Sequence, residues 1–135
     1  MVLILFLKRY LGEGMTKKFN IEEISNYLTK FAKDRDWEQY HTPKNLACAL
    51  SVEASELLEI FQWKTRSEEE DLLGEDNPER KKIEDEISDI ITYAIRLCDV
   101  MNIDLESAMK RKFKDNELKY PADQVKGSAR KYNDY

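Results

Sequence analysis

The sequence predicts an all-α protein of one domain, and three observations support this class. Charged residues make up 36% of the 135-residue chain, which holds only four glycines and three prolines. Apolar residues recur with the helical period of about 3.6 residues over long segments. No segment of useful length shows the strict alternation of polar and apolar residues that a half-buried strand requires. We therefore expect helices packed around a single core.

Capping residues indicate where the helices begin and end. Asn20, with Glu23 three residues later, resembles a capping box and starts a first helix that ends near Arg35. Thr42 and Pro43 supply an N-cap and a first-turn proline for a second helix. The further predicted elements are a short helical turn over residues 68–73, a third helix from Asn77 and Pro78 to about Met101, and a fourth from Asp104 that Pro121 ends.

The second predicted helix carries two carboxylates at the rim of its apolar face. Its apolar stripe, wound at about 100° per residue, comprises Leu46, Leu50, Ala54, Leu57 and Phe61. Glu53 falls within this face on a helical wheel, and Glu56 lies beside it. Both acids are therefore expected on the core-facing surface rather than on the solvent face.

The third predicted helix repeats this pattern with Glu86 and Asp89. Its apolar stripe comprises Ile83, Ile87, Ile90, Ile91, Ala94, Leu97, Cys98 and Met101. If the two helices pack together, four carboxylates converge, and burying so much like charge would cost several kcal/mol per ion unless protons or cations lie among them. Ligands that are all oxygen favour a hard cation, Mg²⁺ or Mn²⁺, and structural ion pairing is the alternative.

Three classes of site or partner fit the sequence poorly. A redox di-iron bundle needs Glu-x-x-His motifs on two helices, whereas the single histidine, His41, lies in a predicted loop. The net charge of −5 argues against a nucleic-acid backbone as partner. The apolar run MVLILFL is too short to span a bilayer, and its charges follow it rather than precede it, so we expect no membrane association.

The ends and the cysteines of the chain suggest three further expectations. Residues 1–18 are interpreted as a non-native N-terminal extension, with Met15 as the hypothetical start of translation. Residues 122–135 form a basic tail that either frays or folds back onto a polyphosphate. Cys48 and Cys98 fall within helical segments and are expected to be reduced, buried thiols, which fits a cytoplasmic protein.

Several segments together resemble the MazG-like all-α nucleotide pyrophosphohydrolases, especially their dCTP pyrophosphatase branch. These segments are DRDWEQYHTPKNLA, EASELLEIFQW, EISDIITYAIRL, KFKDNELKYP and the closing GSARKY, so the resemblance spans roughly residues 19–132. Glu53, Glu56, Glu86 and Asp89 match the E-x-x-E and E-x-x-D motifs of the family. The resemblance implies a bundle of four to five helices over residues 19–121 that forms homo-oligomers through its helix faces, with a tetramer favoured.

The resemblance also implies a house-cleaning enzyme that hydrolyses a nucleoside triphosphate, dCTP or a modified dCTP, to the monophosphate and pyrophosphate. Mg²⁺, or Mn²⁺ as a substitute, would be held by the four acids, and Glu53 or Glu56 would act as the base. The residues implied in substrate binding are Trp37, His41, Trp63 and Tyr93 for the base and sugar, and Lys112 and Asn116 for the phosphates. The alternative of a different class is a non-enzymatic helical scaffold that docks another protein through its acidic loop.

Overall fold

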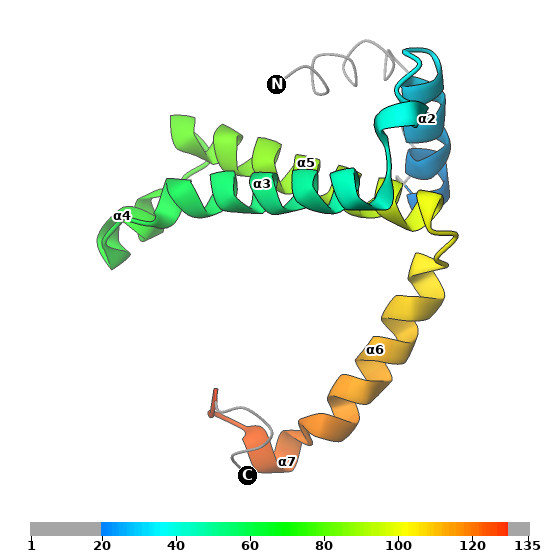
Figure 1. Ribbon diagram of the computed structural model, residues 1–135. Helices are drawn as coiled ribbons and strands as arrows, with labels where there is room; N and C mark the ends of the chain where they lie inside the picture. The colour runs from blue at the N-terminus through cyan, green and yellow to red at the C-terminus, as the bar shows by residue number, and fades with distance from the viewer. Residues whose placement is uncertain (1–19, 130–135) are drawn as a thin grey trace. The chain divides into compact units, whose positions relative to one another are not determined.

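The computed structural model describes residues 20–129, and all regular elements in that range are helical (Figure 1). The elements are α2 (Ile21–Lys33), the 3-10 turn η1 (Glu38–Tyr40), α3 (Pro43–Phe61), α4 (Arg66–Asp71), α5 (Pro78–Val100), α6 (Leu105–Lys119) and α7 (Ala122–Val125). The predicted all-α class is confirmed. The proposed start at Met15 lies outside the described residues.

The predicted caps are found at the helix starts. The side chain of Asn20 accepts a hydrogen bond from the backbone N–H of Glu23 at 2.8 Å. Thr42 caps α3 in the same way, and Pro43 is its first residue. Asp104 caps α6 through the N–H of Ser107 at 3.1 Å. Because these caps satisfy backbone donors that a helix start leaves unpaired, they fix where each helix begins.

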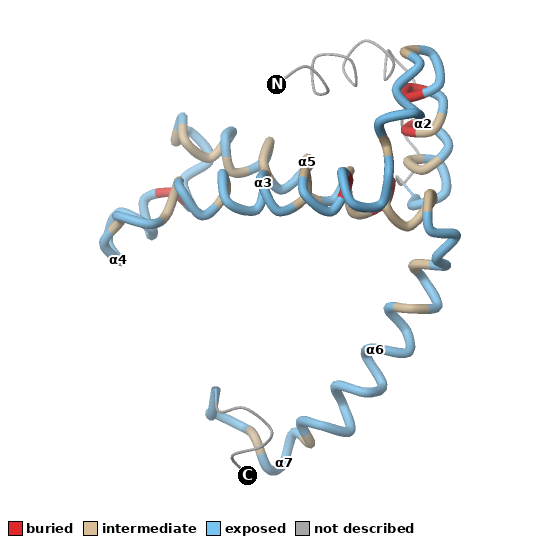
Figure 2. Tube along the Cα trace, in the orientation of Figure 1, coloured by how far each residue is buried: buried red, intermediate tan, exposed pale blue. Residues whose placement is uncertain are grey.

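Residues up to Met101 and residues from Asn102 onward form two separate compact units. In the first unit α3 and α5 lie side by side and antiparallel, and α2 packs against α5 (Figure 1). Most of the buried apolar residues lie in the part of the unit where α2 packs on α5, and Leu72 at the end of α4 is buried apart from them (Figure 2). They include Leu28, Phe31 and Ala32 of α2, Leu46 of α3 and Ile95 of α5.

The predicted burial of the α3 and α5 stripes is only partly correct. Ile87 and Ile91 are 42% and 50% exposed, and Ala54 is also exposed. Ile95, which lies outside the predicted stripe, is only 3% exposed because it lies in the part of α5 on which α2 packs. Elsewhere the α3–α5 pair covers only one face of each helix within this unit. The same reason makes the prediction of a buried thiol wrong for Cys48, which is exposed.

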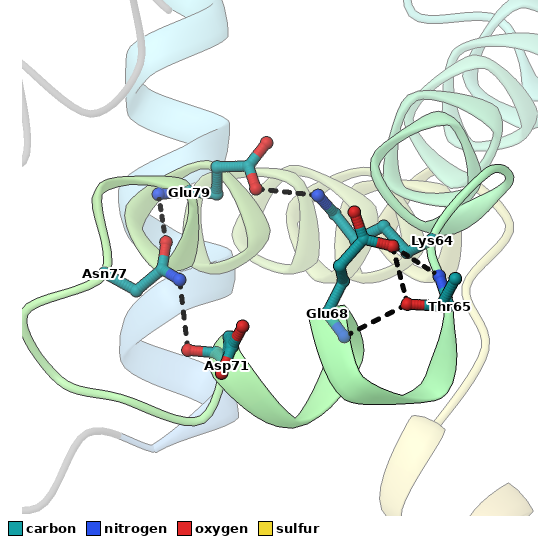
Figure 3. A network of polar contacts seen from close by, with 6 residues as sticks. All are labelled: Lys64, Thr65, Glu68, Asp71, Asn77 and Glu79. Carbon is teal, nitrogen blue, oxygen red and sulfur yellow. Dashed lines mark hydrogen bonds and ion pairs between the residues drawn. The ribbon is translucent and has the colours of Figure 1, made fainter.

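The connection between α3 and α5 is closed by a network of polar contacts (Figure 3). Lys64 Nζ pairs with Glu79 Oε2 at 2.7 Å. The Thr65 hydroxyl accepts from the N–H of Glu68, whose carboxylate accepts in return from the N–H of Thr65, so a full capping box starts α4. Asn77 Nδ2 donates to the last carbonyl of α4 at 3.0 Å. The short helix therefore begins at Arg66, two residues before the predicted turn.

The second unit holds α6 and α7. Pro121 ends α6 as predicted, but the following residues form the short helix α7 rather than an irregular tail. This correction has a local cause, because Pro121 sets the φ angle that begins a new turn and its carbonyl accepts from the N–H groups of Gln124 and Val125. Within residues 20–129, no helix combines the length and the apolar character that crossing a membrane requires.

Candidate metal centre and adjoining pockets

Three of the four predicted acids meet between α3 and α5. Carboxylate oxygens of Glu53, Glu86 and Asp89 lie within 4.8 Å of one another, and all three residues are half-buried. We call these three residues the acid cluster. The i, i+3 spacing puts Glu86 and Asp89 on one side of α5, and the packing of the two helices brings Glu53 opposite them.

The electrostatics of the acid cluster favour a bound cation. Partial burial raises the pKa of Glu53, and the charges of Asp89, Glu56 and Glu86 raise it further. Burial followed by neighbouring carboxylates likewise raises the pKa values of Glu86 and Asp89. The raised pKa values show that the negative charges of the acid cluster repel one another in the folded chain. A set of oxygen ligands in a half-buried site suits a hard divalent cation such as Mg²⁺.

Glu56 lies apart from the acid cluster. It is exposed, so the expectation that both α3 acids lie on the core-facing surface is wrong for this residue. The reason is that α5 covers the side of α3 that carries Glu53, whereas Glu56 lies beyond the edge of this cover. The charge of Glu56 still raises the pKa of Glu53, Glu86 and Asp89, so it adds to the negative potential at the acid cluster.

A wide pocket of about 530 Å³ adjoins the acids on the side of the α3–α5 connection. Glu56 and Glu86 line it together with Trp63, which is 87% exposed. Two lysines that were missed in the sequence, Lys64 and Lys82, also line it. The only sequence signal for them is their position near the helix ends that flank the acid pairs. Lys82 adds positive charge to the wall of a pocket that otherwise repels anions, whereas the charge of Lys64 is paired with that of Glu79.

A small pocket of about 50 Å³ lies in the same unit and holds the other predicted aromatic residues. Trp37, His41 and Tyr93 line it, whereas Trp63 does not. The ring of Trp37 is oriented by an edge-on contact with Phe31, at 5.9 Å between centroids. Burial and then the charges of two residues of the acid cluster, Glu53 and Asp89, raise the pKa of Tyr93. Tyr93 therefore links the small pocket to the acid cluster.

A buried arginine of the small pocket was also missed in the sequence. Arg96 is 7% exposed, and its Nε donates to His41 Nδ1 at 3.1 Å while its Nη1 donates to the hydroxyl of Thr29 at 2.8 Å. Burial and then the charge of Arg96 lower the pKa of His41. A sequence signal existed, because Arg96 interrupts an apolar run between Ile95 and Leu97.

The two residues predicted to bind phosphate lie on α6, in the second unit. Lys112 and Asn116 are both exposed there and share one face of the helix at i, i+4 spacing. Their role toward the substrate stays a prediction.

Comparison with known proteins agrees with the all-α fold and identifies the family. Residues 48–135 match the MazG-like family, and the chain therefore belongs to that family. It is 40% identical over 120 residues to dCTP pyrophosphatase 1 of Homo sapiens, an alignment that covers 84% of this chain and 66% of the human protein. The corresponding Bos taurus protein is 40% identical over 114 residues, with 84% and 67% covered. This chain thus spans about two thirds of the length of these relatives.

A solved structure is similar as well. The crystal structure of a pyrophosphatase from Archaeoglobus fulgidus superposes with a TM-score of 0.68 at 43% identity. The match covers 81% of this chain and 99% of the archaeal chain. At this level of identity the similarity concerns the sequence as well as the arrangement of helices.

Proposed function

We propose that this protein hydrolyses a nucleoside triphosphate to the monophosphate and pyrophosphate in a Mg²⁺-dependent reaction that clears the nucleotide pool of the cytoplasm. The observation that carries the proposal is the acid cluster, in which three carboxylates from two helices lie within 4.8 Å of one another. Membership of the MazG-like family and the similarity to proteins named pyrophosphatases support the same reaction.

Glu53, Glu86 and Asp89 would hold the cation, and Glu56 would complete the ligand set from the rim. Bound Mg²⁺, or Mn²⁺ in its place, would supply charge neutralisation and a more acidic bound water. A triphosphate carries about four negative charges, and the carboxylates alone would repel it. The Glu53 and Glu56 carboxylates are the two candidates for the base that takes a proton from the attacking water.

The walls of the wide pocket would position the phosphates. Lys82 lines this pocket beside Glu56 and Glu86 and offers its ammonium group to the phosphate oxygens, whereas Lys64 in the same wall is paired with Glu79. Lys112 and Asn116 remain predicted phosphate-binding residues, as the resemblance implies. In this arrangement the chain orients the triphosphate chiefly through charge, and the departing pyrophosphate leaves along the lysine-bearing wall.

The nucleobase of the substrate would be held by Trp37, His41 and Tyr93, and Trp63 would offer it a further stacking surface. The pocket that the first three line measures about 50 Å³, far below the volume of a typical ligand site, so its size alone does not select the base. Stacking tolerates any base, so hydrogen bonds to the base edge must supply the discrimination. The similarity to dCTP pyrophosphatases favours dCTP or a dCTP modified at the 5-position.

The proposal predicts a defined ranking in a pyrophosphate-release assay with Mg²⁺. We expect dCTP and 5-methyl-dCTP to be turned over with a kcat/KM about 100-fold or more above that of dATP and dGTP, because a purine would leave the polar groups that pair with the cytosine edge without partners. A higher kcat/KM for a purine would refute the substrate while leaving the reaction intact. No turnover of any nucleotide would instead support the scaffold hypothesis.

We further propose that the protein forms homo-oligomers, with a tetramer as the expected state. Val52 and Leu58 on α3, and Ile87 and Ile91 on α5, are between 42% and 64% exposed within this chain. Two acid-bearing helices that each show apolar residues on an uncovered face suit a second copy of the same chain.

The oligomer is tested by the single substitution Ile91→Glu. A charge on the uncovered face of α5 should reduce the mass measured by light scattering, because burying it in an interface would be costly. Leu73→Glu is the control, since Leu73 is 74% exposed and lies in the turn after α4 rather than on a helix face. A mass unchanged by Ile91→Glu would place the interface elsewhere.

A further inference from the structure

We propose that Arg96 is a positioning residue that holds His41 in a single tautomer, with the ring proton on Nε2, so that the ring offers a hydrogen-bond donor to an acceptor atom on the substrate base. This inference rests on the proposed function for the identity of the ligand. The tautomer itself follows from contacts within the chain.

The direction of the Arg96–His41 hydrogen bond fixes the tautomer. A guanidinium group can only donate, so the nitrogen that faces it must be an acceptor with a free lone pair. Arg96 Nε lies 3.1 Å from His41 Nδ1, so Nδ1 carries no proton. The proton of the neutral ring must then be on Nε2. Protonating Nδ1 would set one N–H group against another.

Arg96 is itself held in place from two sides. Its Nη1 donates to the hydroxyl of Thr29 on α2 at 2.8 Å and lies 3.9 Å from Asp99 Oδ2. The other oxygen of Asp99 accepts from the hydroxyl of Ser25 on α2 at 2.6 Å. The guanidinium is thus clamped between α2 and α5, and His41 receives a donor whose position does not depend on the ligand.

The rest of the surroundings of His41 are consistent with a neutral ring. The charged groups that act on it are Arg96 of α5 and Glu38 of η1. Burial and Arg96 lower its pKa, whereas Glu38 acts in the opposite direction. The net shift is downward, so the neutral form persists to lower pH than it does for a free histidine.

The second ring nitrogen is available to a ligand. His41 Nε2 has no hydrogen-bond partner in residues 20–129, and it is not one of the buried polar atoms that lack a partner. His41 lines the small pocket together with Trp37 and Tyr93. A fixed donor at this place selects a base edge with a carbonyl oxygen or an unprotonated ring nitrogen. Cytosine carries both groups, O2 and N3, and only an N–H group placed directly opposite His41 Nε2 would be rejected.

The single histidine makes a direct test possible. Because the chain contains one histidine, a nitrogen-15 spectrum of histidine-labelled protein without a histidine tag reports on one ring only. For the wild type we expect the Nε2–H tautomer at neutral pH and a pKa below the ordinary 6.5. In Arg96→Met both tautomers should appear and the pKa should rise relative to the wild type. An Nδ1–H tautomer or an imidazolium at pH 7 in the wild type would overturn the proposal.

Kinetics tests whether the tautomer matters for recognition. Arg96→Met should raise the KM for dCTP by about five- to tenfold, the effect of losing one oriented hydrogen bond, and change kcat by less than about twofold. Arg96→Lys, which keeps a charged donor, should recover part of the loss. Arg80→Met is the matched control on the same helix, because Arg80 pairs with Glu84 away from the small pocket and its loss should leave KM unchanged.

The outcomes separate this inference from the proposed function. If the wild type turns over no nucleotide, the proposed function fails, while the spectrum still decides the tautomer. If Arg96→Met releases the tautomer but leaves KM unchanged, recognition through His41 is refuted and the enzyme assignment stands. Should Arg96→Met not fold, Thr29→Val replaces it by removing only one anchor of the guanidinium. An unchanged spectrum and KM in that variant would count against the proposal.

Discussion

Replacing Glu53 or Glu86 by glutamine should lower kcat about a thousandfold or more while leaving the metal-free melting temperature unchanged or higher. Both effects have one origin. These carboxylates repel one another in the metal-free folded chain, and they contribute to turnover by binding a cation. Glutamine keeps the size of the side chain and removes its charge. Pyrophosphate release and thermal melting in EDTA measure the two effects on the same preparations.

Glu84→Gln is the control for these variants. Glu84 lies on α5 close to Glu86 in sequence but is exposed and paired with Arg80, so its loss should affect neither turnover nor melting strongly. A large drop in the metal-free melting temperature of Glu53→Gln or Glu86→Gln would contradict the metal site. It would mean that these carboxylates stabilise the fold as ion-pair partners.

Mg²⁺ should raise the melting temperature of the wild type by about 10 °C at a concentration 100-fold above its dissociation constant. The double variant Glu53→Gln/Glu86→Gln should shift by less than about 1 °C, because it lacks two of the three clustered ligands. Melting curves with KCl at matched ionic strength exclude general salt effects. Equal shifts in the two proteins would rule out the acid cluster as the Mg²⁺ site.

The pH dependence of this shift has a defined sign. The pKa values of Glu53, Glu86 and Asp89 are raised, so the metal-free folded chain binds more protons than the unfolded chain just above their ordinary values of 4.5, 4.5 and 3.8. Stability without metal therefore falls as pH rises through that window. Mg²⁺ restores it by binding the ionised carboxylates, so the Mg²⁺ shift should be larger at pH 8 than at pH 5.

Local signals in the sequence account for the helices and for most of the acid cluster. Capping residues such as Asn20 and Thr42 act within one helical turn, so their effect can be predicted without knowing the fold. The convergence of Glu53 with Glu86 and Asp89 needed only the helical period and one further assumption, that the two acid-bearing helices pack together.

Features that depend on tertiary packing were beyond the sequence. The exposed position of Glu56 depends on where the cover of α5 ends along α3. The pairing of Arg96 with His41 joins residues 55 positions apart, and no periodic pattern encodes it. The predicted stripes treated Ile87 and Ile91 as core because periodicity identifies an apolar face without identifying what covers it.

The polar network at the α3–α5 connection makes the rim of the wide pocket structurally independent of the acid cluster. The side chains of Lys64 and Glu79, one at each end of this connection, meet at 2.7 Å between Nζ and Oε2, so the length of the connection does not set the distance between the acid-bearing helices (Figure 3). Loop-closure entropy changes slowly with length, by about 0.6 kcal/mol per doubling. Insertions between these ends would therefore remodel the rim of the wide pocket, which Glu68 lines, without moving Glu53 or Glu86. On the proposed function, such insertions would change which nucleotide enters while the acid cluster keeps its geometry.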